Sequence, residues 1–117
     1  MRFVILRKSD ATMESDTPAS PELIEAMRQY DDEMRKAGVL VAVERLLPTS
    51  RGTRVRLSKG DFSTVDGPFS ETKELIAGIT MLDVPSKEEA IAWIKRCPTL
   101  CSGDVEAEFE IRPVLDC

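Results

Sequence analysis

The run Leu75-Ile76-Ala77-Gly78-Ile79-Thr80-Met81-Leu82-Asp83-Val84 is mostly apolar and predicts the central strand of a sheet. Alternate residues of a strand point to opposite faces. In this run one face would carry Leu75, Ala77, Ile79 and Met81, and the other Ile76, Gly78, Thr80 and Leu82. Because both sets are largely apolar, this strand is expected to be covered on both of its faces.

Helices are predicted on both sides of this strand along the chain. The first is expected to begin at Ser20, an N-cap residue followed by proline, and to stop at Gly38. Ser86 and Glu89 form a capping box, and Pro98 ends the second helix. The other expected strands are residues 2–8, 39–47, 53–57, 62–65 and 105–114, and residues 9–20 are expected to form a loop.

The resulting order, β-α-β-β-(β)-β-α-β, predicts an α+β fold of the ferredoxin-like type, with a βαββαβ core and both helices on one face of the sheet. A length of 117 residues suits one domain spanning residues 1–117. Since two helices cover only one face, the second apolar face of the run 75–84 is expected to meet another copy of the chain. The sequence therefore predicts a homodimer with its sheets face to face.

Charge and hydropathy argue against two classes of partner. The net charge is −5 and the pI is near 4.8, whereas nucleic-acid binding normally needs a basic face. No apolar run is long enough to cross a bilayer, and Arg7 interrupts the apolar N-terminal segment before a signal-peptide core can form. We therefore expect no nucleic-acid partner, no membrane partner and a cytoplasmic location.

The chain has no histidine, which removes the commonest metal ligand and the usual general base near neutral pH. Its three cysteines, Cys97, Cys101 and Cys117, are an odd number and have no further ligands at the spacing of a metal site. The sequence thus predicts no disulfide framework, no metal and no cofactor.

The segment Val65-Asp66-Gly67-Pro68-Phe69-Ser70-Glu71-Thr72-Lys73-Glu74 contains a bend that cannot continue a helix. In a binding loop, Asp66 and Glu71 would accept protons. Lys73 would hold a polar or anionic ligand, and Phe69 would form a wall. In a structural turn, Asp66 would accept backbone hydrogen bonds and Phe69 would fill the core, with Glu71 and Lys73 in solvent. Both interpretations stay open for the charged residues.

The string 66–74, together with Leu75-Ile76-Ala77-Gly78 and residues 88–93, resembles the DGPF branch of the YCII-related (YciI-like) proteins. The resemblance spans nearly the whole chain and includes residues 37–40, 54–56, 96–98 and 110–114. It implies a dimeric α+β barrel of ferredoxin-like subunits, found in small bacterial proteins that mostly lack an assigned function. Some relatives are encoded beside, or fused to, extracytoplasmic-function sigma factors.

The resemblance also implies a His–Asp pair in a pocket of related proteins, a dehydrochlorinase among them. This chain departs from that pattern because it has no histidine. Many DGPF members read Gly-Glu-Gly-Leu-His-Pro where this chain reads residues 43–48; Glu44 is retained, and Leu47 stands at the histidine position. If the chain is an enzyme, a carboxylate has to act as its base.

The first functional hypothesis is a small-molecule-binding domain, with lyase or isomerase ability as an open question. Its pocket would lie between the sheet and the loop, and the candidate ligand-binding residues are Glu44, Arg54, Asp66, Phe69, Glu71 and Lys73; no catalytic residue is assigned. Arg54 or Arg56 could pair with Glu44 from a neighbouring strand. The alternative is a non-enzymatic regulatory or protein-interaction module, with a sigma-factor system as one setting.

Further charged residues have simpler interpretations. Arginines predicted on strands could bind a carboxylate or phosphate, but pairing within the protein is favoured; they are Arg2, Arg7, Arg54, Arg56 and Arg112. The acidic residues of the first helix are interpreted as a solvated face; they are Glu22, Glu25, Asp31, Asp32 and Glu33.

Overall fold

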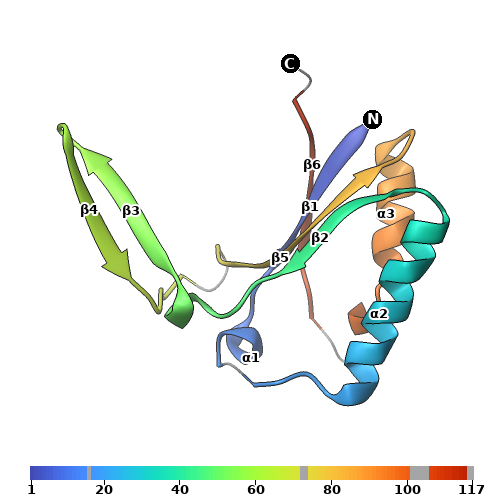
Figure 1. Ribbon diagram of the computed structural model, residues 1–117, viewed down its shortest axis with the longest axis horizontal. Coiled ribbons are helices and arrows are strands. Elements are labelled where there is room, and N and C mark those ends of the chain that lie inside the picture. Colours follow the sequence, from blue (N-terminus) through green and yellow to red (C-terminus); the bar gives the residue numbers. More distant parts are fainter. Residues whose placement is uncertain (16, 72–73, 101–105, 116–117) are drawn as a thin grey trace.

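A computed structural model describes residues 1–15, 17–71, 74–100 and 106–115 of the chain. Its centre is a four-stranded sheet in which all neighbouring strands are antiparallel (Figure 1). Across the sheet the order is β2 (Leu40–Arg45), β5 (Ile76–Asp83), β1 (Arg2–Lys8) and β6 (Phe109–Pro113). Taken in chain order, these strands are the second, third, first and fourth of the sheet, which is the ferredoxin-like arrangement.

Two long helices lie on one face of this sheet, α2 (Pro21–Lys36) and α3 (Lys87–Lys95) (Figure 1). Ser20 caps α2 by accepting a hydrogen bond from Leu23 N–H at 3.1 Å. Ser86 caps α3 in the same way, accepting from Glu89 N–H at 3.3 Å. Both caps were predicted from the sequence, because a serine oxygen satisfies an otherwise unpaired N–H of the first turn.

The core lies between the helices and the sheet. Phe3 faces Leu82 across the β1–β5 pair, and both are buried. The buried cluster consists of Phe3, Ile5, Met34, Leu82, Val84 and Ala90. The opposite face of the sheet carries the other parity, and there Ile79 is 41% exposed while Met81 is half-buried. The two-faced apolar pattern of β5 is therefore covered by helices on one side only.

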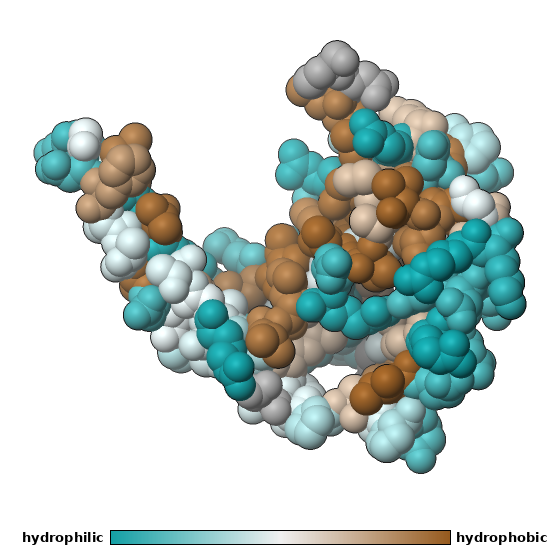
Figure 2. All heavy atoms as spheres, in the orientation of Figure 1, coloured by the Kyte–Doolittle hydropathy of each residue, from teal (hydrophilic) through white to brown (hydrophobic). Residues whose placement is uncertain are grey.

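A separate hairpin, β3 (Thr53–Ser58) with β4 (Asp61–Asp66), is inserted between β2 and β5 and stands away from the body (Figures 1 and 2). Every residue of its strands is exposed. The radius of gyration is 16.0 Å, compared with about 13 Å for a compact domain of this length. We call this hairpin the arm.

The arm has two unlike faces, because directly opposed residues share a face in an antiparallel pair. Val55 lies opposite Thr64, and Leu57 opposite Phe62. The other face carries Arg54 opposite Val65 and Arg56 opposite Ser63. One face is therefore mainly apolar and the other contains both arginines, as the alternation of residues 53–57 predicted.

The structure differs from the sequence expectation in the segment 9–20, which was predicted to be a loop. A short helix, α1 (Ala11–Glu14), forms there because the Asp10 side chain accepts a hydrogen bond from Met13 N–H at 2.8 Å. Short 3-10 turns also occur at Thr49–Arg51 and Pro98–Leu100. The last strand begins at Phe109, later than the predicted residue 105, which lies outside the described residues. In the part of the chain that the structure describes, no helix is both long enough and apolar enough to span a membrane.

Candidate functional site

The Asp-Gly-Pro-Phe loop packs against the turn that follows β2. Gly67 N–H donates to Gly52 O at 2.9 Å, and a Cβ at Gly67 would lie 1.8 Å from Thr49 O. The Gly67–Pro68 peptide bond is cis. Phe69 N–H donates to the Thr49 hydroxyl at 3.0 Å. A glycine is needed at position 67 because the neighbouring backbone leaves no space for a side chain.

Thr49 also connects this loop to α1. Its hydroxyl donates to Glu14 Oε2 at 2.5 Å, and its N–H donates to Glu14 Oε1 at 3.2 Å. Glu14 therefore ties α1 to the same turn that holds Phe69. The base of the arm is fixed by hydrogen bonds from two distant segments of the chain.

Three of the predicted site residues meet at the base of the arm. The Arg54 guanidinium lies over the Phe69 ring, 3.8 Å from its centroid, and 3.8 Å from Glu71 Oε2. Asp66 is exposed and accepts a hydrogen bond from the Thr53 hydroxyl at 2.8 Å. Lys73 lies outside the described residues. These contacts give Arg54, Phe69 and Asp66 partners within the protein itself.

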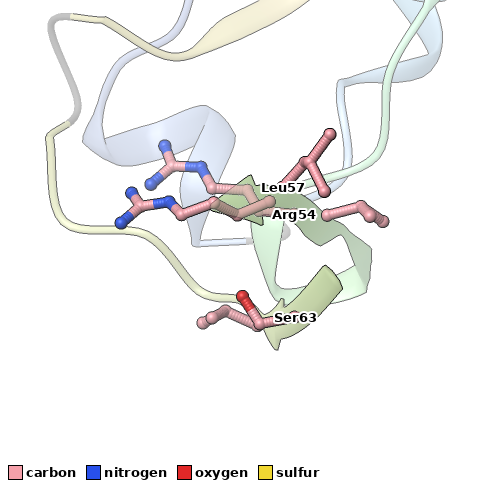
Figure 3. A pocket seen from close by; sticks show the side chains of 6 residues that line it. Arg54, Leu57 and Ser63 are labelled. Carbon is pink, nitrogen blue, oxygen red and sulfur yellow. The ribbon is translucent and has the colours of Figure 1, made fainter. Parts of the chain in front are cut away.

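A depression of about 640 Å³ lies on the arm and is lined by Arg54, Val55, Arg56, Leu57, Ser63 and Val65. Figure 3 shows Arg54 extending to one side of the hairpin and Leu57 to the other. Because every residue that lines it is exposed, this depression wraps around a projecting hairpin and does not enclose a space.

Glu44 lies elsewhere, on β2 and opposite Ile79 of β5. The suggested pairing of Glu44 with Arg54 or Arg56 from a neighbouring strand is not seen, because β2 pairs with β5 and the arm forms a separate sheet. Arg54 contacts Glu71 instead. The structure thus divides the predicted site residues between the arm and the body.

The body contains a second cavity of about 610 Å³ between α2 and the sheet, which we call the α2 cavity. Apolar side chains dominate its walls: Leu23, Ile24 and Met27 from α2, Val43, Leu46 and Leu47 from β2 and the segment after it, and Phe109 from β6. Glu44, Gly78, Thr80 and Met13 of α1 also line it. A concave, mostly apolar space with a few polar groups is the usual form of a small-molecule site.

One ion pair in this cavity joins a buried carboxylate to an exposed guanidinium. Asp31 is 6% exposed, and Arg45 donates to both of its oxygens, at 3.0 and 3.2 Å. The interpretation of Asp31 as part of a solvated acidic face was therefore wrong. Asp31 follows Met27 by four residues, which places it on the apolar stripe of α2, and that spacing could have revealed it.

Arg7 is the second charged group that the site hypothesis missed. It lies opposite Gly78 on the helix-facing side of the sheet and lines the α2 cavity. Its guanidinium is 4.9 Å from the centroid of the Phe109 ring. The Nη1 atom is buried and makes no hydrogen bond to the described residues. Alternation along β1 predicts this placement, because Arg7 has the same parity as the buried Phe3 and Ile5.

Glu25, its partner Arg28 and Tyr30 have perturbed pKa values. Hydrogen bonds from the Arg28 side chain lower the pKa of Glu25 to about 2. Burial raises the pKa of the Tyr30 hydroxyl well above its usual range, and this hydroxyl donates to Trp93 O at 2.6 Å. Cys97 is buried, while Cys101 and Cys117 lie outside the described residues. Within the residues that the structure describes, no three acidic or cysteine side chains lie close enough together to hold a metal ion.

Comparison with known proteins places the chain among relatives of the same fold. A family model described as YCII-related domain matches residues 1–116. An uncharacterised protein of Rhizobium meliloti (strain 1021) is 32% identical over 101 residues, which is 86% of this chain and 77% of that protein. The structure is also similar to 5-chloro-2-hydroxyhydroquinone dehydrochlorinase from Burkholderia phenoliruptrix AC1100, solved in complex with 2,5-dihydroxybenzoquinone. That likeness has a TM-score of 0.52 and 13% identity, and it covers 94% of this chain and 91% of the other. At this identity the likeness concerns the fold alone.

Proposed function

This chain belongs to the YCII-related domain family, and on that premise we propose that it is a homodimeric domain that binds a small organic molecule in the α2 cavity. The observation that carries the proposal is the cavity itself. Its volume of about 610 Å³ falls within the range of roughly 300–1,000 Å³ that ligand sites occupy. Its apolar walls and few polar groups suit a small molecule with an apolar body.

The comparison with the dehydrochlorinase supports the size of the proposed ligand. That enzyme shares the fold and was solved with 2,5-dihydroxybenzoquinone, a small ring compound. A lyase- or isomerase-type activity in this chain would need a carboxylate as its base, because the chain has no histidine. Among the described residues, Asp31 is the carboxylate aimed into the α2 cavity, whereas Glu44 lines it from β2 but shares the helix-free face of the sheet with Ile79.

The homodimer is proposed from two uncovered apolar surfaces. The helix-free face of the sheet carries Val4, Leu6, Ile79 and Met81, and Figure 2 shows hydrophobic side chains gathered on the side of the body turned toward the arm. The apolar face of the arm is uncovered as well, with Phe62 75% exposed and Leu57 61% exposed. A face-to-face pair of subunits would remove both surfaces from water at once.

Nuclear magnetic resonance titration tests the binding proposal directly. Small acids, phenols and neutral amides added to the labelled protein should shift the amides of Met27, Val43 and Gly78. Amides of α3, residues 87–95, serve as the internal control because none of them lines the cavity, and they should not move. Shifts confined to the arm, or no shift with any member of the panel, would contradict the proposal.

Thermal unfolding gives a second measure of the same binding. A ligand present at a hundred times its Kd stabilises the folded state by about 2.7 kcal/mol. That corresponds to a Tm increase of roughly 10 °C for a domain of this size.

A second candidate function is a protein-interaction module, and the projecting arm favours it. An isolated two-stranded hairpin with an exposed apolar face gains stability from a partner. Sedimentation of the purified chain discriminates between the two candidates. A dimer supports the first, whereas a monomer whose arm remains uncovered supports a module that docks onto a different protein.

A further inference from the structure

Among the described residues, one cation of the α2 cavity has no carboxylate partner. Four arginines line the cavity: Arg7, Arg28, Arg35 and Arg45. Arg28 and Arg35 each lie 3.0 Å from a carboxylate oxygen of Asp32, and Arg45 pairs with Asp31. Arg7 forms no such pair with any described residue, and its guanidinium lies over the Phe109 ring.

The position of Arg7 makes this lack of a partner costly. β1 is an inner strand of the sheet, and Arg7 lies between Gly78 of β5 and Phe109 of β6. Its Nη1 atom is buried. Arg7 as a whole is half-buried, so the cost falls on Nη1, whose N–H groups lose water without gaining an acceptor among the described residues. The ring of Phe109 supplies only part of the lost interaction. An acceptor that enters the cavity would restore the remainder.

The surroundings of Arg7 restrict the chemistry of that acceptor. Leu23, Met27, Val43 and Phe109 form apolar walls around the cavity, which favour an organic body over a free inorganic ion. The other cavity arginines already have carboxylate partners, so among the described residues Arg7 is the cavity arginine left to compensate a single negative charge. A planar carboxylate matches the guanidinium geometry, because two parallel N–H groups can donate to its two oxygens.

We propose that the α2 cavity takes a small organic monoanion, an apolar ring or chain carrying one carboxylate, whose oxygens pair with Arg7. This inference rests on the proposed function, because it names the class of ligand for the same cavity. The apolar body would lie against Met27, Val43 and Phe109, and the acidic group would point toward β1. The carboxylate of Asp31, which is buried in the same cavity, would disfavour a second negative charge.

Benzoate and benzamide are suitable probes because they have the same shape and differ in charge. The wild-type protein should bind benzoate about tenfold to a hundredfold more tightly than benzamide, as a hydrogen-bonded charge pair implies. Arg7→Gln should abolish this preference. Arg28→Gln is the matched control, because Arg28 lines the same cavity but is paired with Glu25 and Asp32; it should retain the preference.

The amide shifts of Val43 and Gly78 report the binding in every case, and Arg7→Lys provides a charged variant should Arg7→Gln fold poorly. Retention of the benzoate preference by Arg7→Gln would overturn the inference. Equal binding of both probes to the wild type, with shifts at the cavity, would also overturn it while leaving the proposed function standing. Absence of shifts with either probe would overturn it too, and the wider ligand panel would then decide the proposed function separately.

Discussion

Arg45 and Asp31 form a two-point contact in which the two partners differ sharply in their exposure to water. The Asp31 side chain is 9% exposed, whereas the Arg45 side chain is 48% exposed. Either residue can be replaced, but the group left behind has a different environment in each case. Removing the arginine leaves a carboxylate inside the protein, while removing the aspartate leaves a guanidinium that water can reach.

Arg45→Met is therefore expected to cost about 3 kcal/mol of unfolding free energy, because it leaves a buried charge without its partner. Asp31→Asn is expected to cost only about 1 kcal/mol, since Arg45 can hydrate. Urea unfolding followed by circular dichroism measures both values. Arg35→Met, which breaks a more exposed pair with Asp32, should cost less than about 0.5 kcal/mol. Equal costs for the two cavity variants would show that Asp31 is not buried.

Much of the fold could be predicted from the sequence because its determinants are local. The apolar run 75–84 became β5, and the two serine caps begin α2 and α3. The short helix α1 was missed because a single Asp10 side chain initiates it within a segment that lacks an apolar stripe. The strand predicted at residues 62–65 was found, but its exclusion from the main sheet follows from long-range pairing that no local pattern encodes.

Gly67→Ala should destabilise the base of the arm by about 2 kcal/mol, because the new Cβ would lie 1.8 Å from Thr49 O and one backbone segment must move. Gly52→Ala is the matched control. Its Cβ would meet the same Thr49 O at 3.4 Å, an ordinary contact, and should cost less than about 0.5 kcal/mol. Urea midpoints compare the two variants. Similar losses in both would mean that the loop can relax around the added methyl group.

Leu57→Lys combined with Phe62→Lys should convert the proposed dimer into a monomer. These two side chains lie opposite each other on the apolar face of the arm and are 61% and 75% exposed, so the fold of the subunit should not change. Ser58→Lys combined with Ser63→Lys adds the same charge to the other face and should leave the dimer intact. Sedimentation velocity should give about twice the chain mass of 13.0 kDa for the wild type. A monomeric wild type would contradict the prediction at once.

The Glu25 carboxyl should titrate near pH 2, because hydrogen bonds from Arg28 lower its pKa from 4.5 to about 2. A lowered pKa in the folded state means that the stabilisation is complete above pH 4.5 and is lost as the pH falls through about 2. The carboxyl carbon resonance of Glu25 reports the midpoint. Arg28→Gln should raise the pKa of Glu25 most of the way back to 4.5, whereas Arg35→Gln should leave it low. A wild-type midpoint near 4.5 would show that the Arg28–Glu25 pair does not persist in solution.

The candidate site was harder to predict than the fold. The loop around Phe69 attracted the hypothesis because it combines a bend, a ring and charges, yet the structure gives Arg54, Phe69 and Asp66 partners within the protein. The charged groups of the α2 cavity come from distant strands and a helix, and each is flanked in sequence by unremarkable residues. The sequence did indicate that Arg7 shares the buried face of β1 and that Asp31 lies on the apolar stripe of α2. These indications point to a site only once the fold brings both residues to one cavity.

The hydrogen bonds of Glu14 have a thermodynamic consequence. Met13 lines the α2 cavity, and its neighbour Glu14 holds Thr49 at the base of the arm. Ligand binding in the cavity and the orientation of the arm are therefore connected through the hydrogen bonds between Glu14 and Thr49. If a bound molecule strengthens the association of two chains through these hydrogen bonds, thermodynamic linkage sets the reverse effect. Association of the chains must then raise their affinity for that molecule by the same factor. The apparent affinity of the protein for its ligand would then increase with the concentration of the protein.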